Sequence, residues 1–155
     1  MDLARSIGER LPQSLRRLFR SDRASQLGTR RRYDLGKQGE RSAALFLRKS
    51  GYKILYRNFR SKRGGEIDLV CRDIRENTLV FVEVKTRKTD AFGRPHDAVT
   101  HAQRERIIRG AKEWLRMLDD PRVSYRFDIV EVVMDVPPQI TLLRNAFEMR
   151  DDIYY

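Results

Sequence analysis

Two neighbouring segments of the sequence, 66–73 and 78–87, carry the ionisable residues whose spacing could support chemistry. Both segments alternate apolar and polar residues, and the residues 74–77 between them suit a hairpin loop. Centring the hairpin on this loop places Asp68 opposite Glu83. Period-two alternation then collects the charged side chains on one face, namely Glu66, Asp68, Glu83 and Lys85. The other face receives an apolar set that would lie against a core: Ile67, Leu69, Cys71, Val82 and Val84.

Directly opposed like charges destabilise a β-sheet, so Asp68 and Glu83 require a compensating cation. Lys85 supplies one positive charge, and a divalent metal ion would supply more. Carboxylate oxygens suit Mg²⁺ or Mn²⁺, with water and a substrate phosphate completing the coordination. We interpret Glu66 as a partner of Lys85, with a third metal ligand as the alternative. For the whole set, the alternative is a structural ion-pair cluster on a polar sheet face.

The net charge of the chain points to a polyanionic partner. The 155 residues include 33 Lys and Arg against 22 Asp and Glu, which gives a net charge of +11 and a pI of about 10.3. Such a basic balance favours nucleic acid, and with a carboxylate-bound metal it indicates phosphodiester chemistry. A basic run precedes the acidic segment closely enough to guide a phosphate backbone, with a solvated loop as the alternative: Arg57, Arg60, Lys62 and Arg63.

The composition also excludes several classes of protein. No stretch approaches the roughly 18 to 20 uninterrupted apolar residues that a membrane-spanning helix requires. The single cysteine, Cys71, cannot form an internal disulfide, so we expect a reducing compartment and a cytoplasmic protein. Cys71 should be buried and inert, and Trp114 should belong to the core. His96 and His101 fit solvated or capping roles better than catalytic ones.

Residues 1–33 form a separate basic segment. Nine arginines and three acidic residues give it a charge of +6, about half of the total. Apolar residues recur at helical spacing at Leu3, Ile7, Leu11, Leu15 and Leu18, but Gly8, Pro12 and Gly28 interrupt the pattern. We expect a short amphipathic helix at most, then a flexible arm that is solvated or contacts phosphate. A transit peptide and a helix that docks a membrane surface or a protein partner are the alternatives.

The rest of the chain alternates helical and strand patterns. Helical periodicity covers 36–50 and 98–118, and strand patterns cover 52–56, 66–73, 78–87, 123–134 and 140–143. The order is α-β-β-β-α-β-β, with a crossover helix between the third and fourth strands. This order predicts an α/β domain whose mixed central sheet is flanked by helices. We place the domain at residues 34–146, followed by a tail at 147–155.

Several motifs of this domain together resemble a known family. Residues 65–70 followed by 81–87 are similar to the Asp…Glu-x-Lys core of the PD-(D/E)XK nuclease superfamily. Further motifs lie at 36–40, 51–52, 57–60, 92–93, 98–100 and 126–128, so the match covers about residues 34 to 135. As a set, these motifs resemble the YraN family of bacterial proteins, small cytosolic relatives of the archaeal Holliday junction resolvases.

The resemblance implies a restriction-endonuclease-like fold with an α-β-β-β-α-β core. It implies that Asp68 and Glu83 are metal ligands and that Lys85 orients or polarises the attacking water. It also implies that Glu40, on the first helix, completes the metal site; the alternative for Glu40 is an ordinary charge on the helix surface.

The resemblance also bears on nucleic-acid contacts and on partners. Gln103 stands where relatives carry a lysine early in the second helix, and with Arg104 and Arg87 it is expected to contact nucleic acid. Related resolvases work as dimers, which makes a homodimer one alternative for the oligomeric state.

Two functions follow as hypotheses. The first is a metal-dependent endonuclease that uses Mg²⁺ or Mn²⁺ to hydrolyse phosphodiester bonds in DNA or another structured nucleic acid. The second is a non-catalytic nucleic-acid-binding module that retains the nuclease fold. The intact set of Asp68, Glu83 and Lys85 favours the first. An adaptor that binds a protein partner through residues 1–33 is a third alternative.

Overall fold

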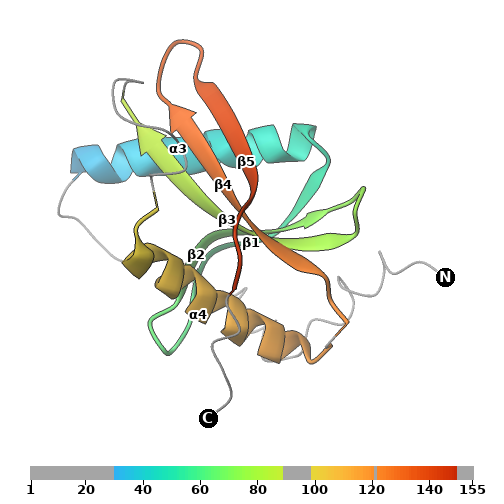
Figure 1. Cartoon of the computed structure of the whole chain (residues 1–155). Coiled ribbons are helices and arrows are strands. Elements are labelled where there is room, and N and C mark those ends of the chain that lie inside the picture. The colour runs from blue at the N-terminus through green and yellow to red at the C-terminus, as the bar shows by residue number, and fades with distance from the viewer. Residues whose placement is uncertain (1–29, 89–98, 121, 150–155) are drawn as a thin grey trace.

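In the part of the chain that the structure describes, five strands form one sheet and two helices cover its opposite faces (Figure 1). The computed structural model describes residues 30–88, 99–120 and 122–149. The elements are α3 (Arg30–Lys49), β1 (Tyr52–Arg60), β2 (Glu66–Asp73), β3 (Thr78–Arg87), α4 (His101–Leu118), β4 (Tyr125–Val133) and β5 (Gln139–Phe147). Neither of these helices has the length and hydrophobicity that crossing a membrane requires. The patterns predicted within residues 1–29, the motif at 92–93 and His96 lie outside the described residues.

The strand order is β1-β2-β3-β4-β5. Only the β3–β4 pair of this sheet is parallel, because α4 crosses between these two strands, and the other three pairs are antiparallel. The predicted α/β fold with a mixed sheet and an α-β-β-β-α-β order is therefore confirmed. The predicted bounds of β2 and β3 agree with the structure, whereas α3 begins at Arg30 rather than Gly36 and β5 extends to Phe147.

Each face of the sheet has its own hydrophobic core. On the α3 side, Leu47 packs with a buried set of strand residues that includes Leu69, Cys71, Val80 and Val82. On the α4 side, the buried residues include Ile107 and Trp114 of the helix and Phe59, Ile67, Val70 and Phe81 of the strands. Cys71 and Trp114 are thus both buried core residues, as predicted.

The prediction that Ile67 shares a face with Leu69 is wrong. Ile67 belongs to the α4-side core and Leu69 to the α3-side core, so side-chain alternation breaks between them. The break coincides with a feature of the neighbouring strand, where Asn58 has a left-handed backbone with a φ of 53°. Because Arg57 pairs with Leu69 and Phe59 with Ile67, the register places Asn58 across from Asp68. Both strands therefore turn at Asp68.

A network of charged and polar side chains, buried at Arg126, Asp73 and Asp128 and exposed at Glu76 and Arg144, lies near the 74–77 loop, at the other end of β2 from Asp68. We call it the Arg126 cluster: Tyr52, Asp73, Glu76, Arg126, Asp128 and Arg144. Arg126 donates hydrogen bonds to Asp73 at 2.9 Å and to Asp128 at 3.0 Å. Burial alone would raise the pKa of Asp73, but hydrogen bonds from Arg126 and from two backbone N–H groups lower it overall. Burial raises the pKa of Asp128, against hydrogen bonds from the Asn145 backbone and Arg126.

Candidate functional site

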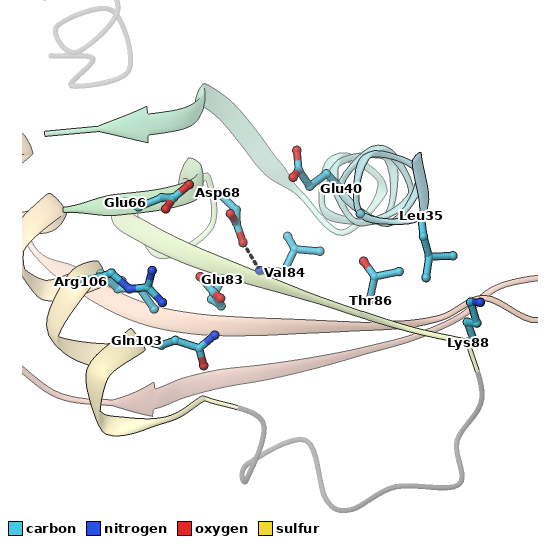
Figure 2. Close-up of a pocket in the computed structure, with 12 residues that line it drawn as sticks. Leu35, Glu40, Glu66, Asp68, Glu83, Val84, Thr86, Lys88, Gln103 and Arg106 are labelled. Atoms are coloured by element: carbon cyan, nitrogen blue, oxygen red, sulfur yellow. Dashed lines mark hydrogen bonds between the residues drawn. The ribbon is translucent and has the colours of Figure 1, made fainter. Parts of the chain in front are cut away.

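An open pocket of about 730 Å³ lies between α3 and α4, where β2 and β3 separate. Figure 2 shows Glu40 on the α3 side, Gln103 and Arg106 on the α4 side, and Asp68 and Glu83 between them. The residues that line the pocket are Leu35, Gly36, Glu40, Glu66, Asp68, Glu83, Val84, Thr86, Lys88, Gln103, Arg106 and Ile107. The structure therefore brings four of the predicted carboxylates, Glu40, Glu66, Asp68 and Glu83, to one pocket.

The hairpin geometry delivers Asp68 and Glu83 to this pocket. The predicted register is confirmed for the pairs from Leu69 and Val82 to the loop. Beyond Leu69 the pairing of β2 with β3 ends, and the Asp68 carboxylate accepts a hydrogen bond of 2.7 Å from the backbone N–H of Val84. The side chain of Asp68 thus serves as the acceptor for the Val84 N–H where the pairing of β2 with β3 has ended. The same hydrogen bond holds one carboxylate oxygen of Asp68 in a fixed position.

The electrostatics around Asp68 are unfavourable for a carboxylate. Burial, followed by the negative charge of Glu83, raises the pKa of Asp68 to about 8. The hydrogen bond from Val84 opposes this shift, and the charges of Glu40 and Glu66 add to it. A pKa raised in this way means that the ionised form is held at a cost in free energy. A cation bound at the pocket would favour the ionised form.

Glu83 and Lys85 form an ion pair with a distance of 2.8 Å between Lys85 Nζ and Glu83 Oε1. Both side chains are largely buried, at 15% exposed for Glu83 and 18% for Lys85. Glu83 lines the pocket, whereas Lys85 contacts it through Glu83. The predicted adjacency of Lys85 to the acidic set is therefore present, and its ammonium binds the Glu83 carboxylate.

Glu66 has a different partner from the one that the sequence suggested. Its carboxylate binds Arg60 at 3.1 Å, so the prediction that Glu66 pairs with Lys85 is wrong. The reason is that β1 and β2 are paired at Arg60 and Glu66, which brings the two side chains together across neighbouring strands. Glu66 still lines the pocket, with its charge partly neutralised by an exposed arginine.

Glu40 reaches the pocket because α3 approaches β3 very closely. A Cβ atom on Gly39 would lie 1.8 Å from the Oγ1 atom of Thr86, so only glycine allows this contact. The carboxylate of Glu40 accepts a hydrogen bond of 3.2 Å from the Asn58 amide. The side-chain amide of Asn58 thus holds Glu40, which is therefore more than an isolated charge on the helix surface.

The predicted nucleic-acid-binding residues lie in several places. Arg57, Lys62 and Arg63 are exposed on β1 and on the turn that follows it. That turn contacts α4, because a Cβ on Gly65 would lie 2.2 Å from the backbone nitrogen of Gly110. The basic turn therefore lies against α4 at Gly110, on the buried side of the helix.

Three other predicted contacts are engaged within the protein. Gln103 lines the pocket, and its side-chain oxygen accepts the N–H of Thr100 in a capping box at the start of α4. Arg104 lies over the ring of Phe147, 5.5 Å from its centroid, and Arg87 binds Glu131 at 2.8 Å.

Sequence reasoning did not select Arg106, which lines the pocket from α4 and is exposed. Arg106 follows Gln103 by three residues on the same helix, and residues three or four apart share a helix face. This spacing could have indicated that Arg106 lies beside Gln103 at the pocket. Lys88 also lines the pocket, at the end of β3.

The donor set fits a hard divalent cation. Among the described residues, no three His, Cys, Asp or Glu side chains are grouped closely enough to hold a metal ion between them. Mg²⁺ does not require three protein ligands, because it retains several waters and is commonly held by one or two carboxylates and substrate phosphate. Asp68 and Glu83 supply such a pair, and the raised pKa of Asp68 indicates carboxylates short of positive charge.

Comparison with known proteins identifies the family. Residues 39–132 match the model of a family described as "Uncharacterised protein family UPF0102". A UPF0102 protein of Caldicellulosiruptor saccharolyticus is 44% identical over 117 residues, which cover 74% of this chain and 97% of the relative. One from Geobacter sulfurreducens is 44% identical over 117 residues (74% and 89%), and one from Nocardia farcinica is 50% identical over 100 residues (64% and 76%). The chain therefore belongs to the UPF0102 family, which is the YraN family that its motifs resemble.

Proposed function

We propose that the protein is a metal-dependent nuclease that hydrolyses phosphodiester bonds in nucleic acid, with DNA favoured as the substrate. The observation that carries the proposal is the placement of Asp68 and Glu83 in one open pocket, where burial and mutual repulsion raise the pKa of Asp68 to about 8. The resemblance of the Asp…Glu-x-Lys pattern to the PD-(D/E)XK core supports the same reading.

In this proposal Asp68 and Glu83 hold Mg²⁺ or Mn²⁺, and Glu40 assists from α3. A bound ion of this kind acts as a Lewis acid and lowers the pKa of a coordinated water. The Val84 N–H fixes one oxygen of Asp68, and Lys85 fixes Glu83 through its ion pair. The positive charge of Lys85 also favours negative charge that develops nearby on the reacting phosphate.

Basic residues around the pocket are proposed to bind the nucleic-acid backbone. Arg106 lines the pocket from α4, on the opposite side from Glu40, and offers a planar fork that suits a phosphate. The exposed Lys62 and Arg63 lie on the turn that contacts α4, so a backbone that enters the pocket would pass both elements. The charge of +11 favours the same kind of partner.

A non-catalytic nucleic-acid-binding module is the second candidate function. The observation that favours it is that Lys85 is paired with Glu83 and is not among the residues that line the pocket. In such a module the carboxylates would be a structural set, and the basic residues would bind backbone without any cleavage.

Cleavage of end-labelled substrates tests the proposal. The substrates are single-stranded, duplex, flapped and four-way-junction DNA, and RNA, each with Mg²⁺ or Mn²⁺. The unaltered protein is compared with Asp68→Asn and Lys85→Ala. Glu113→Gln is the matched control, because Glu113 pairs with Arg116 on α4 and does not line the pocket.

The expected result is metal-dependent cleavage that falls by about a hundredfold or more in both pocket variants and is unchanged in the control. Cleavage that survives both substitutions would overturn the catalytic assignment. Binding of nucleic acid without cleavage of any of these substrates would favour the second candidate.

A further inference from the structure

We propose that Asn58 is a positioning residue of the pocket with two separable roles. Its left-handed backbone turns Asp68 toward the pocket, and its side-chain amide holds Glu40. The second role rests on the proposed metal-dependent function, and the first does not. Neither role belongs to the Asp…Glu-x-Lys pattern.

The backbone role follows from the break in side-chain alternation. Asn58 has a φ of 53° within β1, and the strand register places it across from Asp68. At this point Ile67 faces α4 while Leu69 faces α3, so β2 turns together with β1. The turn coincides with the end of β2–β3 pairing and with the 2.7 Å hydrogen bond from Val84 to Asp68. Apart from glycine, asparagine and aspartate are the residues that tolerate this backbone conformation best.

The side-chain role follows from a single contact across elements. The Nδ2 atom of Asn58 donates to Oε2 of Glu40 at 3.2 Å, which links β1 to α3. An amide donor restricts the rotation of the carboxylate and occupies one of its oxygens, which leaves the acceptor capacity of the other oxygen for a further partner. Groups that orient metal-binding side chains in this way commonly change metal affinity by about 10- to 100-fold when removed.

The chain contains its own control for the backbone conformation. Asn145 lies in β5 with a φ of 50°, and its N–H donates to Asp128 at 2.9 Å. Asn58 and Asn145 thus share a left-handed backbone within a strand at an edge of the sheet, and each adjoins an aspartate of the next strand. Asn145 belongs to the surroundings of the Arg126 cluster and does not line the pocket.

The experiment compares Asn58→Gly, Asn58→Ala and the control Asn145→Ala with the unaltered protein. Glycine keeps the positive φ and removes the amide, whereas alanine removes the amide and strains the backbone. The first measurement is hydrogen exchange of the Val84 amide by NMR without metal, which reports the Val84–Asp68 bond. The second is the affinity for Mn²⁺ by isothermal titration calorimetry. Thermal melting of all variants separates local from global effects.

For Asn58→Gly we expect Val84 exchange within about twofold of the unaltered protein and Mn²⁺ affinity about tenfold weaker. For Asn58→Ala we expect the affinity to fall further. Its Val84 exchange should be at least about tenfold faster than in Asn145→Ala, which carries comparable backbone strain elsewhere. Asn145→Ala should lower the melting temperature and keep Mn²⁺ affinity within about twofold.

Mn²⁺ affinity unchanged in Asn58→Gly would overturn the role of the amide. Val84 exchange in Asn58→Ala no faster than in Asn145→Ala would overturn the role of the backbone. If the unaltered protein fails to bind Mn²⁺, the proposed metal-dependent function and the amide role both fall, while the exchange comparison still decides the backbone role.

Discussion

The pocket and the Arg126 cluster are two concentrations of charge on the same sheet, and they are built in opposite ways. In the Arg126 cluster, Asp73 is buried and yet has a lowered pKa, because Arg126 and two backbone N–H groups bind it. In the pocket, Asp68 has one backbone donor and a neighbouring Glu83, and its pKa rises to about 8. Burial raises the pKa of both aspartates, most strongly that of Asp68, and the opposing groups also differ: Arg126 and two backbone N–H groups for Asp73, one backbone N–H for Asp68.

Asp128 of the Arg126 cluster also has a pKa raised by burial, so the two regions are separated by the partners that their carboxylates have, and not by the direction of one pKa shift. A buried charge with a full set of partners holds the fold in register and has little capacity for another ligand. A group of carboxylates that repel one another beside an open pocket retains capacity for a cation from outside. The number of buried ionisable residues alone would not have distinguished the two regions.

Removing the central arginine should produce the largest effect. Arg126→Met leaves the carboxylates of Asp73 and Asp128 without their main cation, which should lower the free energy of unfolding by about 3–5 kcal/mol. Urea denaturation at pH 7 measures it. Asp68→Asn, which replaces a group whose ionised form is unfavourable with a neutral one, should keep or increase stability. A loss no larger for Arg126→Met than for Asp68→Asn would erase the distinction between the two regions.

The pH dependence of stability should reveal the unfavourable charge of Asp68. Its folded pKa of about 8 lies above its unfolded value of 3.8, so the folded state binds the proton more tightly. The resulting stability is complete below about pH 4 and is lost as the pH rises toward 8. We expect a loss on the order of 3 kcal/mol, about half of the full shift, because partial exposure screens the charge.

Denaturation gives the free energy of unfolding between pH 4 and 8 for the unaltered protein and for Asp68→Asn. The change with pH in the difference between these two free energies is the contribution of Asp68. Parallel curves would show that Asp68 titrates normally in the folded state. They would thereby remove the electrostatic contrast with Asp73.

Mn²⁺ should stabilise the protein only through the pocket. At a concentration of about 100 times its Kd, one bound ion adds about 2.7 kcal/mol to the free energy of unfolding. Denaturation with and without Mn²⁺ should show this gain in the unaltered protein and in Glu113→Gln, and its absence in Glu83→Gln. An equal gain in Glu83→Gln would locate the ion elsewhere.

The smallest predicted effect concerns Arg106. If this side chain contacts one phosphate, Arg106→Ala should reduce the salt dependence of DNA binding by about one unit in the slope of log K against log salt. Fluorescence anisotropy over a range of salt concentrations measures the slope. Arg109→Ala is the matched control, since Arg109 is exposed on the same helix and does not line the pocket. Equal slopes for Arg106→Ala and the unaltered protein would exclude the contact.

Much of the fold could be predicted because its determinants are local. The hairpin loop at 74–77 and the alternation around it predicted the pairing of β2 with β3 from Leu69 and Val82 to the loop, and Asp68 and Glu83 follow directly beyond the last pair, in one pocket. The apolar stripe of α4 likewise predicted Trp114 in the core. These patterns depend on neighbours within one or two elements.

The rest of the site depends on contacts that no local pattern encodes. The partner of Glu66 is set by the pairing of β1 with β2, which the sequence left without a register. Asn58 carries a positive φ inside a strand, and asparagine occurs in ordinary strands as well, so the turn of β2 at Asp68 could not be foreseen. Arg106 enters the pocket only because α4 crosses the sheet at this point.

The contact between Gly65 and Gly110 acts as a fixed spacer between two halves of the pocket. A Cβ on Gly110 would lie 2.9 Å from the side chain of Ile67, and one on Gly65, directly before β2, would lie 2.2 Å from the backbone of α4, so only glycine at both positions allows this approach. The separation between the helix that carries Arg106 and the strand that carries Asp68 is thus set by backbone atoms. A change of charge in the pocket would therefore have to overcome this contact before α4 could move closer to β2.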